Sequence, residues 1–238
     1  MSTSYVVRAC AALALAGCGL PSLAATPATL PDTLEQRVAA CTACHAVKER
    51  GDAFFPRIAG KPAGYLYNQL VNFREGRRHY PMMTYMVDHL PDAYLREIAD
   101  YFSQQHPPYP PTQAGSGASA SAASLARGQT LMQQGDPAKK IPACVACHGS
   151  ALTGVAPAIP GLIGLPSDYV NAQFGAWKNK VRRAAAPDCM AEIANRLSEA
   201  DVAAVSGWLS KQTPDAAARP ADSIAMPLPL NCGSAPAP

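Results

Sequence analysis

Two copies of one five-residue pattern constrain this chain more than any other feature of its 238 residues. The pattern Cys-x-x-Cys-His begins at Cys41 and again at Cys144. At this spacing two thiols can add across the vinyl groups of a haem, and the adjacent imidazole can bind the iron as its proximal ligand. The sequence therefore predicts two covalently bound haem c groups. Their thioether bonds are assigned to Cys41, Cys44, Cys144 and Cys147, and their proximal iron ligands to His45 and His148.

A zinc site or a pair of redox disulfides is the alternative interpretation of two Cys-x-x-Cys pairs, because four thiolates can bind zinc when they converge. Two observations favour haem. Each pair is followed directly by His. The N-terminal segment also directs the chain to a compartment where haem is attached and thiols do not stay reduced.

The first 25 residues have the pattern of an export signal. Arg8 ends a short basic region, residues 9–16 are apolar, and residues 22–24 offer a cleavage site between small residues. Residues 15–18 resemble a bacterial lipobox, which would make Cys18 a lipidated N-terminus that tethers the protein to a membrane. An ordinary secretory signal that contains a cysteine is the alternative. Both routes predict a periplasmic protein, and no later segment has the long apolar run of a transmembrane helix.

The two motifs belong to a longer internal repeat. Residues 56–65 align without a gap on residues 160–169, with Pro, aliphatic, Gly, Pro and Tyr positions recurring. The same offset of 104 (169 − 65) pairs Gln69 with Gln173, Phe73 with Trp177 and Arg78 with Arg182. Further on, residues 90–101 match residues 197–208. An internal duplication with one haem in each half is the simplest explanation.

The repeat also selects a second iron ligand in each half. An electron carrier favours two fixed ligands, and a Met sulfur opposite His raises the potential. The candidates are Met82, Met83 and Met86 in the first half and Met190 in the second. Met190 precedes Leu197 by seven residues (197 − 190), and Met83 precedes Leu90 by the same seven (90 − 83), so the register favours Met83. Cys189, beside Met190, is the rival ligand, because thiolate-ligated haem performs other chemistry.

Polar residues of the repeat are candidates for contacts with the haem propionates, since such groups supply charge and hydrogen bonds that tune the potential. They are Tyr65, Gln69 and Arg78 in the first half and Tyr169, Gln173 and Arg182 in the second. A solvated basic face is the alternative role for the arginines. His79 has no counterpart in the repeat, although a second imidazole ligand there would give a bis-His iron.

Two cysteines remain outside the haem motifs and the signal segment, namely Cys189 and Cys232. Exported proteins often pair such thiols, so we expect a disulfide that fixes the C-terminal tail to the second half. Two free thiols are the alternative.

The internal repeat and the helical pattern of each half predict an all-α fold with two tandem domains, each wrapped around one haem, and length and composition agree with this. The segments are the signal at 1–25, a first domain at 26–104, a linker at 105–123, a second domain at 124–212 and a tail at 213–238. The linker is rich in Pro and then in Ala, Ser and Gly, and the tail is rich in Ala and Pro and expected to be irregular. Helices are expected before each haem motif, with Thr33 and Ser124 as caps, from Tyr65 and Tyr169 onward, and near 92–103 and 198–211. No segment shows a strand pattern.

These features together resemble a di-haem class I cytochrome c of the cytochrome c4 type. The resemblance covers nearly the whole chain after the signal and depends on both haem motifs, the repeated Pro- and Gly-containing loops and the methionines seven residues before the last helix of each half. It implies two class I cytochrome c domains about a pseudo-twofold axis, His/Met iron and periplasmic electron transfer, often towards a terminal oxidase. The chain departs from that pattern in a shortened first helix, an insertion at 184–188 and a tail containing Cys232.

The predicted function is electron transfer between redox partners in a respiratory chain, with a membrane donor and a terminal oxidase or dehydrogenase as partners, and not catalysis. A di-haem oxidoreductase, either a peroxidase or similar to thiosulfate dehydrogenase, would need an open or thiolate-ligated iron, for which Cys189 is the only indication. A cytochrome subunit of a dehydrogenase complex is the third class. The formal net charge of +3 is too small to indicate nucleic-acid binding.

Overall fold

The structure is a computed structural model that describes residues 31–45, 55–109, 120–213, 215–223 and 227–235. The predicted signal segment, with Cys10 and Cys18, lies outside the described residues, as does most of the predicted linker. The chain divides into two compact units, Met1–Asp32 and Thr33–Pro238, and the second unit contains both haem motifs.

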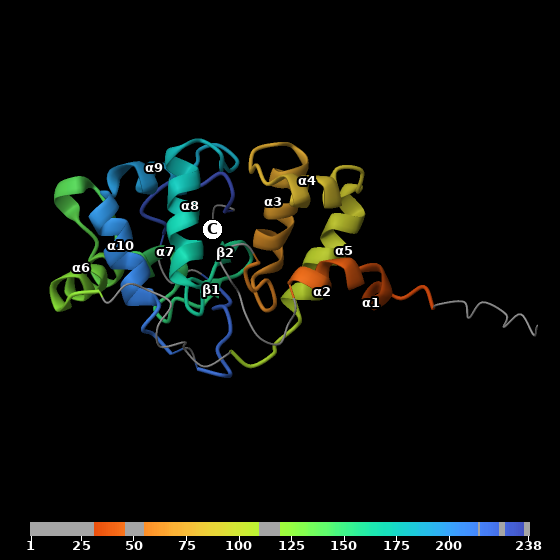
Figure 1. The fold of residues 1–238 in the computed structure, drawn as a ribbon, viewed down its shortest axis with the longest axis horizontal. Helices are drawn as coiled ribbons and strands as arrows, with labels where there is room; N and C mark the ends of the chain where they lie inside the picture. The colour runs from red at the N-terminus through yellow and green to blue at the C-terminus, as the bar shows by residue number, and fades with distance from the viewer. Residues whose placement is uncertain (1–30, 46–54, 110–119, 214, 224–226, 236–238) are drawn as a thin grey trace, which may run out of the picture. The chain divides into compact units, whose positions relative to one another are not determined.

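The described residues form two successive groups of helices within the second unit (Figure 1). The first group is α1 (Leu34–Arg37), α2 (Ala39–Cys44), α3 (Ala63–Arg74), α4 (Pro81–Val87) and α5 (Asp92–Ser103). The second group is α6 (Ala122–Gln133), a short 3-10 helix (Pro137–Lys139), α7 (Val145–His148), α8 (Ser167–Lys178), α9 (Cys189–Arg196) and α10 (Glu199–Leu209). The prediction of a helix-rich chain is thus confirmed.

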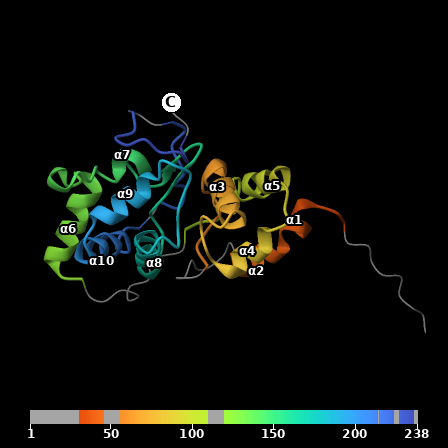
Figure 2. The same cartoon turned by 90° about the horizontal axis from the view of Figure 1, so that it is seen from above.

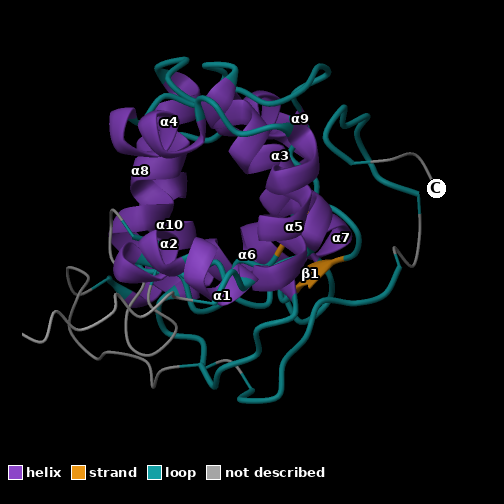
Figure 3. Cartoon of the chain, turned by 90° about the vertical axis from the view of Figure 1, so that its right-hand side faces the viewer, coloured by secondary structure: helices purple, strands orange, loops and turns teal. Residues whose placement is uncertain are grey.

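One small β-hairpin was not expected from the sequence. Strand β1 (Gly154–Val155) pairs antiparallel with β2 (Ile159–Pro160), in the loop that follows the second haem motif (Figure 3). The prediction that no strand forms is wrong here, because two residues per strand are too few to leave an alternating pattern in the sequence.

Helix starts follow local side-chain chemistry. The Thr33 hydroxyl caps α1 as predicted, and Pro81 occupies the first turn of α4, where a missing N–H costs no hydrogen bond. The prediction of Ser124 as a cap is wrong. The N-cap of α6 is Ser121, whose hydroxyl accepts a hydrogen bond from the Ser124 backbone N–H at 3.2 Å, because the alanines between the two serines extend the helix by one turn.

Each group of helices encloses its own apolar core. In the first, Val38, Leu66 and Phe102 are buried where α3 packs on α5. In the second, the core lies among α6, α8 and α10, and α6 and α10 lie side by side (Figure 2). Gly128 of α6 allows this approach, because a Cβ there would lie 2.2 Å from the carbonyl oxygen of Ala204.

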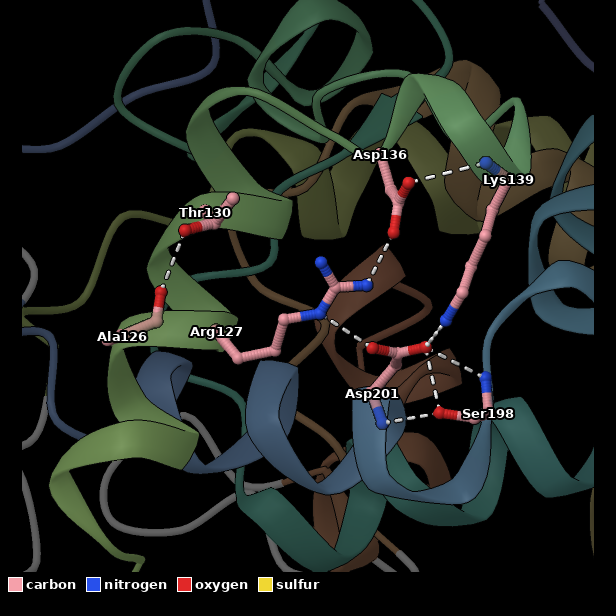
Figure 4. Close-up of polar contacts among 7 residues, drawn as sticks. All are labelled: Ala126, Arg127, Thr130, Asp136, Lys139, Ser198 and Asp201. Atoms are coloured by element: carbon pink, nitrogen blue, oxygen red, sulfur yellow. Dashed lines mark hydrogen bonds and ion pairs between the residues drawn. The ribbon is translucent and has the colours of Figure 1, made fainter.

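A cluster of charged side chains ties α6, the 3-10 helix and α10 together (Figure 4). Arg127 Nε donates to Asp201 Oδ1 at 2.8 Å and its Nη2 donates to Asp136 Oδ2 at 2.7 Å, while Lys139 Nζ donates to Asp201 Oδ2 at 2.7 Å. Asp201 also completes a capping box with Ser198. Burial alone would raise the pKa of Asp201, but the hydrogen bonds from Lys139, Arg127 and Ser198 hold that pKa well below its usual range.

No helix among the described residues is both long enough and apolar enough to span a bilayer.

Candidate haem sites

The first haem motif faces a cavity lined mostly by the first group of helices, with residues of α8 and of the loop after it forming another part of the wall. Cys41, Cys44 and His45 line this cavity, and so do the three methionines of α4. His45 Nδ1 is 2.9 Å from the carbonyl oxygen of Pro56, to which it donates, because a carbonyl can only accept. This bond places the ring lone pair on Nε2, which is the arrangement that an iron ligand requires.

The second motif faces a second cavity, which also has residues of both halves in its wall. Cys144, Cys147, His148 and Met190 all line it. His148 is buried and its Nδ1 donates to the carbonyl oxygen of Pro160 at 2.7 Å, so the hydrogen bond of the first half recurs at the matching proline. Burial lowers the pKa of His148 and raises the pKa of Cys144 to about 12. Both shifts favour neutral side chains in an apolar pocket.

The alternative interpretations of the Cys-x-x-Cys pairs find no support in the described residues. The four motif cysteines are unpaired thiols, so neither pair forms a disulfide. Within the same described part of the chain, no group of three or more His, Cys, Asp or Glu side chains converges to hold a metal ion. Each pair instead faces its own cavity beside a histidine and a methionine, which fits one haem per half.

Neighbouring methionines of α4 differ in burial. The Met82 side chain is 58% exposed, whereas Met83 is partly buried and packs against the cluster of Phe73, Val87 and Leu95. In the second half, Met190 lies in the first turn of α9 and packs against the core. The burial difference agrees with the register in favouring Met83 over Met82.

Cys189 and Cys232 form a disulfide, with their Cα atoms 5.1 Å apart. The expected link between the tail and the second half is confirmed. Because its sulfur is bonded to Cys232, Cys189 does not present a thiolate to the second cavity.

The six residues predicted to contact propionates come together, and they do so across the two halves. Arg78 donates to Gln69 Oε1 of its own half at 2.9 Å and to Gln173 Oε1 of the other half at 2.8 Å. Arg182 makes the reciprocal pair, to Gln173 at 2.7 Å and to Gln69 at 3.2 Å. Arg78 also donates to the Tyr169 hydroxyl at 3.1 Å. Sequence reasoning identified these residues but not the cross-half pairing.

The backbone repeats this symmetry. Arg78 and Arg182 form an antiparallel bridge, flanked by hydrogen bonds from His79 N to Val181 O at 2.8 Å and from Arg183 N to Arg77 O at 2.7 Å. Each guanidinium also stacks on the matching aromatic ring of its own half, Arg78 on Phe73 at 4.7 Å and Arg182 on Trp177 at 3.9 Å. The local contacts are therefore related by the same twofold correspondence as the sequence repeat.

This interface carries buried positive charge. Among the described residues, the side-chain acceptors of Arg78 and Arg182 are glutamine and tyrosine oxygens and not carboxylates. Burial and the nearby Arg78 lower the pKa of Arg182. Lys61, which the sequence analysis missed, lines both cavities and donates to the Gly161 carbonyl at 3.0 Å. Burial lowers the pKa of Lys61 to about 8. Buried and partly buried cations without protein carboxylates fit a cofactor that brings carboxylates of its own, as haem does.

Comparison with known proteins agrees with this geometry. The cytochrome c family model matches residues 35–106. Cytochrome c4 from Pseudomonas aeruginosa is 32% identical over 178 residues, which are 74% of this chain and 85% of the relative. The chain belongs to the cytochrome c4 family. This cytochrome therefore carries two covalently bound haem c groups and transfers electrons, and each haem iron supplies the one-electron redox chemistry.

Two further matches extend the comparison. A protein from Thiomonas intermedia named thiosulfate dehydrogenase electron acceptor is 37% identical over 176 residues, 73% of this chain and 79% of the relative. The solved structure of cytochrome c4 from Acidithiobacillus ferrooxidans superposes with a TM-score of 0.60 at 27% identity, covering 74% of this chain and 99% of that one. The predicted all-α architecture of tandem class I cytochrome c domains is confirmed.

Proposed function

We propose that this cytochrome receives electrons from a thiosulfate-oxidising enzyme and passes them through two His/Met haems to an acceptor in a respiratory chain. The similarity to the electron acceptor of thiosulfate dehydrogenase from Thiomonas intermedia carries this proposal. That similarity spans 176 residues, more than the 89 residues (212 − 124 + 1) of the predicted second domain, so it includes both halves.

The proposed iron ligands are His45 with Met83 and His148 with Met190. Each cavity contains one such histidine and one such methionine, and each histidine donates its Nδ1 proton to a proline carbonyl. A six-coordinate iron changes its geometry little between oxidation states and leaves no position for a substrate. This ligand set supports a carrier and not an enzyme.

The proposed role of the interface is to hold the haem carboxylates near one another. Buried Arg182 and partly buried Arg78 and Lys61 are the cations that would pair with them, and Gln69, Gln173 and the two tyrosines would fix the guanidinium positions. Positive charge close to a haem favours the ferrous state, so these residues would raise both potentials.

The remaining proposals concern location and domain limits. Residues 1–25 would direct export to the periplasm, with or without lipidation at Cys18. Residues 26–104 and 124–212 would form the two haem domains, joined by the linker at 105–123 and followed by the tail at 213–238. The ends of α5 at Ser103 and of α10 at Leu209 support the C-terminal limits of the two domains, whereas α6 begins at Ala122, within the proposed linker.

The test mixes the oxidised holoprotein with each reductant in a stopped-flow instrument and monitors haem reduction through the haem absorbance. We expect thiosulfate together with a thiosulfate dehydrogenase to reduce both haems, and thiosulfate alone to reduce neither. Reduction by thiosulfate alone would indicate an enzyme. No reduction in either mixture would contradict the thiosulfate proposal and favour the second candidate, a carrier for another respiratory donor, which the relatives named cytochrome c4 support.

A further inference from the structure

The C-terminal tail contains no helix within its described residues, yet it is attached to the second half at several points. Ala156 N donates to Ala221 O at 2.7 Å, and Ala221 N donates to Gly154 O at 2.9 Å, so the tail extends the small β-hairpin. Further along, Leu230 packs against the core of the second half. The tail is therefore part of the folded domain.

The tail ends at the turn that carries Met190. Cys232 is bonded to Cys189, the residue directly before Met190 in the chain. Gly233 N donates to the Pro187 carbonyl at 2.9 Å, and a Cβ on Gly233 would lie 2.1 Å from the carbonyl oxygen of Ala186. Covalent and backbone contacts thus fix the tail to both sides of Asp188.

The same stretch of tail forms part of the wall of the second haem cavity. The tail residues that line it are Leu228, Leu230, Cys232, Ser234 and Ala235. The Ser234 carbonyl also accepts a hydrogen bond from Asn68 Nδ2 of α3 at 2.9 Å, so this tail segment is attached to the first half as well. A segment fixed at both halves and at the disulfide cannot leave the cavity without breaking all of these contacts.

The loop before Met190 has a second support from inside. Asp188 accepts hydrogen bonds from Ala191 N at 3.0 Å and from Ala184 N at 2.7 Å, which caps α9 and closes the inserted loop. Met83 also lies in the first turn of its helix, α4, and packs against the cluster of Phe73, Val87 and Leu95, but no tail segment lines the first cavity among the described residues. Within the described residues, no disulfide occurs in the first half.

We propose that residues 227–235 act as a strap that positions Met190 as the sixth ligand of the second haem and closes that haem to small ligands, with the Cys189–Cys232 disulfide as its fastening. The proposal deepens the proposed function and rests on its assignment of His148 and Met190 to the second iron. In this account, Cys189 and Cys232 are positioning residues for one haem only. The first haem does not depend on them.

The experiment compares the wild-type holoprotein with the double variant Cys189→Ala/Cys232→Ala, in which no free thiol remains beside the iron. Two readouts are recorded: the near-infrared sulfur-to-iron band of the oxidised protein and carbon monoxide binding by the ferrous protein. We expect the wild type to show two Met-ligated irons and no carbon monoxide binding. We expect the double variant to lose the band of one haem and to bind one carbon monoxide per chain, while the first haem remains as the internal control.

A second variant tests the strap if the double variant cannot be produced as a protein that carries both haems. Gly233→Ala leaves both cysteines in place but forces the strap away from Ala186, so it should weaken the band of the same haem. Gly175→Ala in α8 is the matched control, since a Cβ at that position meets nothing within 4 Å, and it should leave both bands unchanged.

The outcomes separate the strap from the function on which it rests. A wild type with only one Met-ligated iron would contradict the proposed ligation itself, and the strap with it. A wild type with two Met-ligated irons, together with variants that keep both bands and exclude carbon monoxide, would leave the ligation intact and overturn the strap. The disulfide would then only stabilise the tail.

Discussion

Adjacent residues of α4 differ in what they can do for the first haem. Met83 is partly buried against Phe73 and its cluster, whereas Met82 is largely exposed, although both line the cavity. We therefore predict that Met83→Ala removes the sulfur-to-iron band of one haem and lets its ferrous iron bind carbon monoxide. Met82→Ala, the matched control, should leave the spectrum unchanged. A lost band in the Met82 variant and an intact one in the Met83 variant would reverse the assignment.

Arg182 gives a second prediction for single residues. Arg182 is buried and lines both cavities, so its positive charge should favour ferrous iron in each of them. Arg182→Gln should lower both haem potentials, each by on the order of 60 mV, which is about a tenfold change in a one-electron equilibrium. A redox titration measures this, with the exposed Lys211→Gln as the control. Unchanged haem potentials would show that the positive charge of Arg182 does not stabilise ferrous iron.

At the scale of helices, the cluster around Asp201 joins α6 and α10. Removing one partner of a buried ion pair costs about 3–5 kcal/mol, and because Arg127 and Lys139 are partly exposed we predict about 2 kcal/mol for Asp201→Asn. Urea unfolding at neutral pH measures this, with Glu199→Gln in the same first turn as the control. Equal stability of the Asp201 variant and the wild type would mean that the cluster contributes nothing net.

The same cluster predicts a pH dependence. The folded-state pKa of Asp201 is depressed, so its contribution is fully present above the unfolded carboxyl pKa of about 3.9 and is lost as the pH falls through the folded value. The stability difference between wild type and Asp201→Asn should therefore be constant from pH 7 to about 5 and shrink below about 4. A difference that grows on acidification would contradict this sign.

Helices were predictable where caps, periodicity or the repeat marked them, and less so elsewhere. Residues 92–103 were expected as a helix and form α5, since Pro91 and an acidic first turn mark its start. The start of α6 was misplaced by one turn because Ser121 and Ser124 both carry a capping hydroxyl. The hairpin at Gly154 was missed because its pairing is set by the loop and tail around it and not by a local pattern.

Across the whole molecule, the repeat identified which residues correspond but not which residues touch. The repeat aligns Arg78 with Arg182, but it does not indicate that each arginine donates a hydrogen bond to the glutamine of the other half. Lys61 was overlooked because its counterpart in the repeat (61 + 104 = 165) is Leu165, so no pattern marked it. The haem attachment residues were predictable because covalent chemistry fixes their spacing, whereas contacts between the halves depend on packing.

The central claim for the whole molecule is that both haems are six-coordinate and serve electron transfer. A redox titration of the wild-type holoprotein, recorded in the haem absorbance with and without carbon monoxide, tests it most directly, because carbon monoxide binds open ferrous iron and raises its apparent potential. We predict that each chain takes up two electrons and that the titration curve recorded with carbon monoxide coincides with the curve recorded without it. A rise in the potential of either haem under carbon monoxide would contradict the carrier and reveal an iron that is open to a substrate.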